Sequence, residues 1–138
     1  SSRKKTDALK QIIDALNFSN KIFVINDRIE KIAHNTSYRN IFDIGTTRAV
    51  GSPSTVAEYI LPMLNMNGRG LLYCGKWNKK DEVRISNTLN TLKASITKIK
   101  KTQLPKNKGE RNIIVIKPEE NCPDSYPRGI GKPAKYPL

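Results

Sequence analysis

Cysteine, histidine and glycine-rich loops are scarce in this sequence, and each shortage excludes a class of chemistry. The 138 residues include two cysteines, too few for a disulfide framework, and neither stands at metal-ligand spacing from the one histidine, His34. The sequence offers no Ser/His/Asp or Cys/His set for covalent catalysis, and no Gly-x-Gly-x-x-Gly or Walker loop to hold phosphates. We therefore expect a reduced intracellular protein without a metal site, in the cytoplasm or in a plastid.

Long apolar runs are missing as well. No stretch approaches the roughly 20 apolar residues that span a bilayer, and no basic amphipathic helix rich in Trp or Phe is found, of the kind that lies on membranes. We therefore expect no membrane partner. The chain begins on Ser1 and Ser2 without a signal-peptide core or an initiator methionine. We interpret it as a piece of a longer protein from which an N-terminal part is absent.

Acidic residues are the third shortage. The chain carries 25 Lys and Arg against 12 Asp and Glu, a net charge of +13, and from Lys98 onward the ratio is ten to four. Such a surplus favours an anionic partner, with nucleic acid first, because each phosphate contact releases counterions. The length suits one domain, and 37% hydrophobic with 27% charged residues is typical of a folded chain.

What the sequence does contain is an alternation of helix and strand patterns, typical of an α/β fold with a parallel sheet. Apolar residues recur at three- and four-residue spacing over residues 3–16, which predicts an amphipathic helix. The other expected elements are a strand at 21–26, a short helix at 29–33, a strand at 41–46, a helix from 52 to about 64, a strand at 69–75, a helix from 79 to about 98, and an antiparallel hairpin of 99–104 and 111–117 around a turn at 105–109.

Composition changes after Pro118, so we divide the chain into an α/β domain, residues 1–118, and a basic tail rich in Pro and Gly, residues 119–138, packed on or beside it. The tail is not expected to hold a helix or a central strand. It combines Tyr126 and Tyr136, available for base stacking, with the cations Arg128, Lys132 and Lys135, a mixture that suits an RNA backbone. The alternative interpretation is a solvated, frayed terminus.

One ligand contact is suggested by position alone. Within the stretch 42–50 an apolar strand pattern ends in Thr46, Thr47 and Arg48. In open α/β sheets ligands bind outside the carboxyl ends of strands, which makes Arg48 a candidate contact. The turn Asp27-Arg28-Ile29-Glu30 follows the preceding strand pattern in the same way. For both sites the alternative is local: such residues also cap helices or pair with surface carboxylates.

Several motifs, in this order and spacing, resemble those of one known family across essentially the whole chain. They are the opening Ser-Ser-Arg-Lys-Lys, Asp27-Arg28-Ile29-Glu30, Thr47-Arg48-Ala49-Val50, Glu58-Tyr59-Ile60-Leu61-Pro62, Gly68-Arg69-Gly70 and Tyr126-Pro127-Arg128-Gly129-Ile130-Gly131-Lys132-Pro133. The chain thus resembles the C-terminal portion of the glucose-inhibited division protein B family, also called ribosomal RNA small subunit methyltransferase G.

The resemblance implies a class I, Rossmann-like methyltransferase sheet with a C-terminal antiparallel hairpin, lacking its first strands and its Gly-rich loop. It also implies transfer of a methyl group from S-adenosylmethionine to N7 of a guanine in small-subunit ribosomal RNA. By the same resemblance Ile29 and Glu30 lie around the adenine, Arg48 binds the cofactor, and Ser1 and Ser2 follow a ribose-binding acid. Because the cradle for the methionine end is absent, we expect the chain alone to be inactive.

Three interpretations of function remain. For an RNA methyltransferase we assign the phosphate contacts to Arg111, Arg128, Lys132 and Lys135. The second interpretation is a non-enzymatic RNA- or ribosome-binding module whose basic tail makes the contact. A nicotinamide- or nucleotide-binding Rossmann domain ranks last, because the sequence has no phosphate loop.

Overall fold

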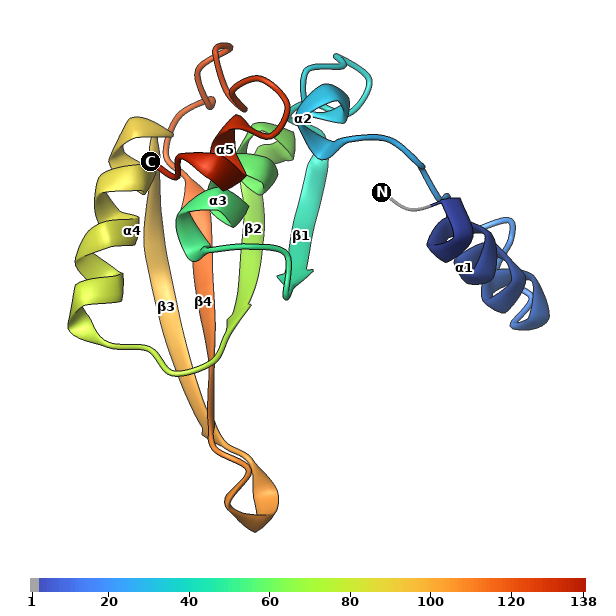
Figure 1. The fold of residues 1–138 in the computed structure, drawn as a ribbon. Helices are drawn as coiled ribbons and strands as arrows, with labels where there is room; N and C mark the ends of the chain where they lie inside the picture. Colours follow the sequence, from blue (N-terminus) through green and yellow to red (C-terminus); the bar gives the residue numbers. More distant parts are fainter. Residues whose placement is uncertain (1–2) are drawn as a thin grey trace.

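The molecule is built on one mixed sheet with helices on one face. The structure is a computed structural model that describes residues 3–138, and Asn107 by its backbone alone. Four strands lie in the order β1-β2-β4-β3, and Figure 1 shows α3, α4 and the C-terminal helix α5 against the same face. The elements are α1 (Arg3–Ala15), α2 (Ile29–Ile32), β1 (Phe42–Arg48), α3 (Pro53–Ile60), β2 (Leu64–Cys74), α4 (Lys79–Thr91), β3 (Ala94–Gln103), β4 (Glu110–Pro118) and α5 (Lys132–Lys135), with 3₁₀ turns at Leu61–Met63 and Pro105–Asn107.

The strand directions confirm the predicted α/β class and the C-terminal hairpin. β1 and β2 are parallel, with Arg48 opposite Tyr73 at their carboxyl ends. β4 is antiparallel to both β2 and β3, so β3 runs parallel to β1 and β2. β1 forms one edge of the sheet and β3 forms the other. β4 thus lies between β2 and β3, so both strands of the hairpin belong to the sheet.

The core lies between this sheet and the helices α3 and α4. Leu72 of β2 and Ile114 and Ile116 of β4 are fully buried, as are Ile85 and Leu89 of α4. Two strand glycines make the close packing geometrically feasible, because a Cβ on Gly45 would stand 2.8 Å from Ile60 Cγ2 and one on Gly70 would stand 2.8 Å from Ile116 Cγ1. The helix α3 begins where the sequence predicts, with Ser52 accepting a hydrogen bond from the Thr55 amide and Pro53 in the first turn.

Two helix ends differ from the predicted ends. The helix expected to reach residue 98 ends at Thr91, after which Lys93 takes a left-handed conformation (φ 58°) and β3 starts at Ala94. The apolar residues at positions 94–98 are spaced in a way that fits either a helix or a strand. In the structure these residues form a strand because they pair with β4. The α-helix after Ser52 ends at Ile60, because Pro62 has no N–H with which to continue the helical hydrogen bonds. The chain goes on as a 3₁₀ turn, Leu61–Met63, and β2 begins at Leu64.

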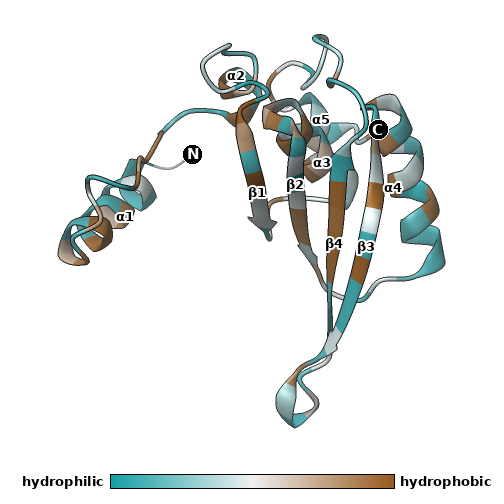
Figure 2. Cartoon of the chain, turned by 180° about the vertical axis from the view of Figure 1, so that it is seen from behind, coloured by the Kyte–Doolittle hydropathy of each residue, from teal (hydrophilic) through white to brown (hydrophobic). Residues whose placement is uncertain are grey.

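The strand predicted at residues 21–26 is wrong, because this segment has no regular structure. Phe23 is 84% exposed, and Ile22 and Ile25 are also exposed. A strand needs a neighbour for its N–H and C=O groups, and the one sheet among residues 3–138 contains only β1 to β4. The helix α1 is confirmed, but both ribbon views show it standing apart from the sheet (Figures 1 and 2), and its large apolar residues other than Ile13 are exposed.

The tail differs from the expected irregular segment in one element, the single helical turn α5. Gly131, in a left-handed conformation (φ 78°), precedes it, and Pro133 occupies its first turn, where a missing N–H costs nothing. Pro127 and Pro133 are buried. The Arg39 guanidinium holds the tail by donating hydrogen bonds to the carbonyls of Cys122, Pro123 and Tyr126 at 2.8–3.0 Å. The frayed terminus is therefore not what the structure shows.

Candidate cofactor pocket and basic surfaces

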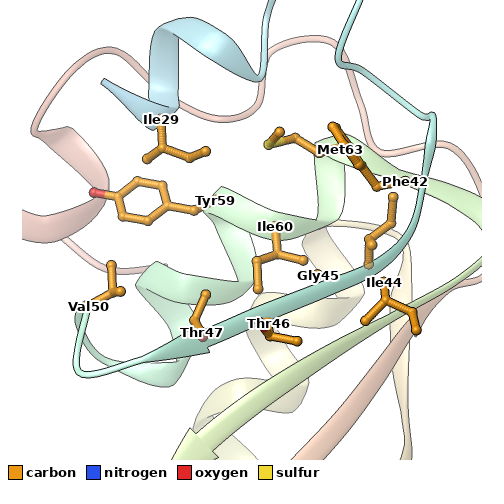
Figure 3. A pocket seen from close by; sticks show the side chains of 11 residues that line it. Ile29, Phe42, Ile44, Gly45, Thr46, Thr47, Val50, Tyr59, Ile60 and Met63 are labelled. Atoms are coloured by element: carbon orange, nitrogen blue, oxygen red, sulfur yellow. The ribbon is translucent and has the colours of Figure 1, made fainter. Parts of the chain in front are cut away.

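An apolar pocket of about 370 Å³ runs along the outer edge of β1, between that strand and α3 (Figure 3). This volume lies within the range of small-molecule sites, roughly 300–1,000 Å³. The lining side chains come from α2, β1, the loop after it, α3 and the start of β2: Ile29, Phe42, Ile44, Gly45, Thr46, Thr47, Val50, Tyr59, Ile60, Met63 and Leu64.

The end of the pocket nearest α2 is lined by apolar and aromatic side chains. In Figure 3 the Tyr59 ring lies beside Ile29, with Val50 and Thr47 on the near side of α3. These groups offer apolar and aromatic surface for stacking, and Thr47, on the face of β1 toward α3, adds a polar side chain. The pocket can therefore take an adenine-sized ring, whereas the residues that line it carry no charge.

Glu30 supports the wall of this pocket from behind. Its carboxylate is 3% exposed and accepts hydrogen bonds from the Tyr59 hydroxyl (3.3 Å) and from the Gly131 amide of the tail (2.9 Å). Burial opposes ionisation, but the hydrogen bonds from the Gly131 amide, from the backbone amide of Glu30 itself and from Tyr59, together with the charge of Arg28, outweigh it, so the pKa of Glu30 lies below its usual value. Burial, and then the Glu30 charge, raise the pKa of Tyr59. Of the predicted pair, Ile29 lines the pocket and Glu30 fixes it.

Arg48 lies at the carboxyl end of β1 and is exposed. Side chains alternate along a strand, and Gly45 faces Ile60 of α3, so Arg48 points to the opposite face of the sheet. It does not line the pocket. Its side chain forms no hydrogen bond or ion pair with any residue of the described range 3–138, so neither local alternative, a helix cap or a surface ion pair, explains it. The predictions for Ser1 and Ser2 lie outside the described residues.

Arg128 is engaged inside the protein. Its Nε and terminal nitrogen bind the Glu58 carboxylate at 2.9 and 2.7 Å, and the same terminal nitrogen donates to the Tyr136 carbonyl at 2.8 Å. Glu58 is fully buried in α3, and its hydrogen bonds raise the pKa of Arg128, against the opposing effect of burial. The guanidinium therefore neutralises a buried charge, which leaves little of it for a phosphate.

The other three predicted RNA contacts lie on two separate surfaces. Lys132 and Lys135 are exposed on α5, where the Lys135 ammonium stands 5.2 Å from the centre of the Tyr136 ring. Arg111 is exposed on β4, in the hairpin that Figure 1 places at the far end of the sheet from α5. The structure thus does not join the four residues into one patch.

Sequence reasoning missed the two buried carboxylates as a pair that holds the tail. Glu30 binds the Gly131 amide and Glu58 binds both the amide and the guanidinium of Arg128. One signal was present in the sequence, because Glu58 is flanked by the apolar residues Val56, Ala57, Tyr59 and Ile60 in the predicted helix. A carboxylate buried among apolar neighbours needs a partner.

Among residues 3–138, no cluster of three or more His, Cys, Asp or Glu side chains is arranged to hold a metal ion. No helix in that range is long and apolar enough to cross a membrane.

Comparison with known proteins gives a consistent result. The sequence model of one family, described as rRNA small subunit methyltransferase G, matches residues 1–114. The chain is 59% identical over all 138 residues to a ribosomal RNA small subunit methyltransferase G of Prochlorococcus marinus strain MIT 9515, and 58% identical to that of strain CCMP1986. A relative from strain NATL2A is 40% identical over the same length. The chain spans 58%, 58% and 56% of the length of these three relatives.

Proposed function

The chain belongs to the rRNA small subunit methyltransferase G family, and we propose that the protein transfers a methyl group from S-adenosylmethionine to N7 of a guanine in small-subunit ribosomal RNA. The observation that carries the proposal is the 59% identity to a protein of that name over the whole chain. The Rossmann-like sheet and the pocket beside β1 supply a scaffold of the right kind.

The residues present fit one end of this cofactor. We assign the adenine to the pocket end formed by Ile29, Val50 and Tyr59, where apolar and aromatic surface is available. Arg48 is the charged group proposed to contact the cofactor from the carboxyl end of β1. Among residues 3–138 no Gly-rich loop is available for the methionine end, so we expect weak binding by the chain alone.

The reaction asks little proton transfer of the protein. S-adenosylmethionine supplies an electrophilic methyl group on a sulfonium, and N7 of a neutral guanine already carries a lone pair. The protein's own residues would therefore act by holding the base and excluding water, since correct positioning alone can lower a barrier by several kcal/mol, of order 7–11 in the best cases. No general acid or base is assigned.

Calorimetric titration with S-adenosylmethionine tests the proposal. It is carried out on the 138-residue chain and on a version extended to the length of its relatives, followed by methyl transfer from labelled S-adenosylmethionine to small-subunit RNA. We expect binding and transfer with the extended protein, and weak or no binding with the chain. Ile29→Glu in the extended protein should weaken binding at least tenfold, because it places a charge in the apolar pocket. Val83→Glu, on the exposed side of α4, is the matched control.

A second function, a non-enzymatic RNA- or ribosome-binding module, is favoured by one observation, the net charge of +13. The same experiment separates the two. If the extended protein binds RNA but takes up no S-adenosylmethionine and transfers no methyl group, the binding module replaces the enzyme.

A further inference from the structure

The hairpin of β3 and β4 extends beyond the rest of the sheet. Pairing with β2 ends where Cys74 meets Asn112. The next pairs, Thr102 with Arg111 and Gln103 with Glu110, belong to β3 and β4 alone, and the turn Pro105–Asn107 lies farther out. Figure 1 shows this two-stranded arm projecting past the ends of β1 and β2. An arm that packs on nothing in the described chain has its surface available to a partner.

Positive charge is concentrated on this projecting hairpin and on the residues of β3 that lead into it. We call the whole segment, residues 98–111, the β3–β4 arm, and within it Lys98 and Lys100 lie where β4 still pairs with β2. Residues 98–111 contain one acidic side chain, Glu110, and six cations, all exposed: Lys98, Lys100, Lys101, Lys106, Lys108 and Arg111. Glu110 bonds to Asn112 and pairs with Lys101 at 2.5 Å, and these two contacts lower the pKa of its carboxyl. Glu110 therefore neutralises Lys101 alone among the six cations.

Four of the lysines have no counter-charge inside the protein. Within residues 3–138, Lys98, Lys100, Lys106 and Lys108 form no ion pair or hydrogen bond through their side chains. Like charges gathered on a narrow ribbon repel one another, so the arrangement weakens the free protein slightly. An anionic partner would convert this repulsion into attraction.

The register places part of this charge in a row. Lys98 pairs with Val115, Lys100 with Ile113, and Thr102 with Arg111, so these side chains lie on the sheet face away from α3 and α4. Neighbouring positions in such a row are about 7 Å apart. A row of separate cations at this spacing suits the successive phosphates of a nucleic-acid backbone.

The arm also leaves the sheet at its ligand-binding edge. β4 is antiparallel to β2, so its first residues lie beside the carboxyl ends of β1 and β2, the edge that carries Arg48. This is the edge at which α/β sheets bind their ligands. A partner held by the arm would therefore lie at the edge of the sheet that carries Arg48.

We propose that the β3–β4 arm binds the phosphate backbone of RNA beside the target nucleotide. The inference rests on the proposed function and adds the surface that holds its substrate. RNA is favoured over an acidic protein because no large exposed apolar side chain lies within residues 98–111. Protein partners are usually anchored by buried apolar or aromatic groups, whereas phosphate binding needs separate, solvated cations.

The test compares two triple variants that remove the same charge from different places. One carries Lys100→Gln, Lys106→Gln and Lys108→Gln on the arm, and the other carries Lys4→Gln, Lys5→Gln and Lys10→Gln on α1, where all three lysines are also exposed. Affinity of the 138-residue chain for a duplex RNA is measured by fluorescence anisotropy at several salt concentrations, without S-adenosylmethionine. Circular dichroism checks that each variant is folded.

We expect the arm variant to bind RNA about 10- to 100-fold more weakly, with a slope of log affinity against log salt reduced by about two to three, since each lost phosphate contact contributes roughly 0.7 to 0.9. The α1 variant should retain most of the affinity. Equal losses of RNA affinity in both variants would overturn the inference, because the binding would then depend on the total charge of the chain and not on the arm. Tighter arm-dependent binding to poly-glutamate than to RNA would also overturn it, in favour of an acidic protein partner.

A measurement on the unmodified chain keeps the test independent of folding. Amide hydrogen exchange with and without RNA should show protection in residues 98–111, and protection elsewhere alone would contradict the proposal. These results are separable from the proposed function. If the arm binds RNA but the extended protein transfers no methyl group, the proposed function is wrong and the RNA-binding role of the arm stands. If the extended protein transfers methyl groups equally well with and without the arm substitutions, the role of the arm is wrong and the proposed function stands.

Discussion

Two regions of this molecule have similar apolar sequence patterns but different structures. In the packed region, residues 27–138, apolar side chains from β2, β4, α3 and α4 form one core. In the N-terminal arm, residues 3–26, Ile13 is buried but most of the other large apolar side chains are exposed, and Phe23 is the extreme case. The N-terminal arm still forms α1, because a helix satisfies its own backbone hydrogen bonds. Its strand-like segment stays irregular because a strand cannot.

The packed region can also hold charge, which the N-terminal arm keeps in solvent. Glu30 and Glu58 are buried, and each is satisfied by the tail. Burying a carboxylate is costly unless it is paired and hydrogen-bonded. The tail is thus an integral part of the packed region, and removing its contacts would leave Glu58 without a partner and Glu30 with the Tyr59 hydroxyl in place of two donors.

The largest expected effect follows from breaking the Glu58–Arg128 pair. Arg128→Met leaves the fully buried Glu58 carboxylate without its partner, and breaking such a pair costs about 3–5 kcal/mol. Arg3→Met, the same change on the exposed end of α1, should cost less than about 0.5 kcal/mol. Urea unfolding followed by circular dichroism measures both.

A double substitution sharpens this result. Glu58→Leu combined with Arg128→Met removes both charges, and it should recover a large part of the stability because apolar replacements of buried pairs are often neutral. If the single Arg128→Met change cost less than about 1 kcal/mol, the tail would not be held as the structure indicates.

The next effect compares one substitution in the two regions. Ile114 of β4 is fully buried and Ile12 of α1 is 55% exposed. Ile114→Ala should lower the free energy of unfolding by about 2–5 kcal/mol, since it leaves a cavity in the core. Ile12→Ala should change it by less than about 0.5 kcal/mol, because an exposed side chain buries little apolar surface. Thermal and urea unfolding decide, and equal losses would mean that α1 packs on the sheet in solution.

Sequence reasoning was most successful where local signals and tertiary contacts agree. The start of α3 at Ser52-Pro53 and the hairpin around residues 105–109 carry their own turn chemistry, and both were predicted. Long-range pairing could not be predicted in the same way. Residues 21–26 and 113–116 are both short apolar runs, and only the second lies between two partner strands.

The candidate site divides along the same line. By resemblance Ile29 was assigned to the adenine. The structure shows that Ile29 lines the pocket beside β1, and its contact with a cofactor stays a prediction. The predictions for Arg48 as a cofactor contact and for Lys132 and Lys135 as RNA contacts stay predictions. The role of Arg128 could not be inferred from its position in the basic tail, because its partner Glu58 stands 70 residues away in the sequence.

Acid titration isolates the second buried carboxylate. The folded-state pKa of Glu30 lies below its ordinary value of 4.5, so the group adds stability above pH 4.5, and this is lost as the pH falls through the lowered pKa. Glu30→Gln should remove this part of the acid dependence. Asp7→Asn, on exposed α1, is the matched change in the N-terminal arm and should affect the curve less. Stability measured from pH 3 to 7 would contradict the assignment if both variants behaved alike.

The smallest expected effect on the fold comes from Cys122, a residue of the tail whose thiol is buried against the core. Burial raises the pKa of Cys122 to about 12, so at pH 8 the thiol is neutral and shielded. An aromatic disulfide reagent should therefore modify a cysteine introduced by Leu9→Cys on α1 at least 100-fold faster than Cys122. Because the native pKa lies above the ordinary value of 9.0, Cys122 should also lower stability as the pH rises from 9 toward 12. Rapid modification of Cys122 at pH 8 would show that the tail opens readily, and the packed region would then end before residue 119.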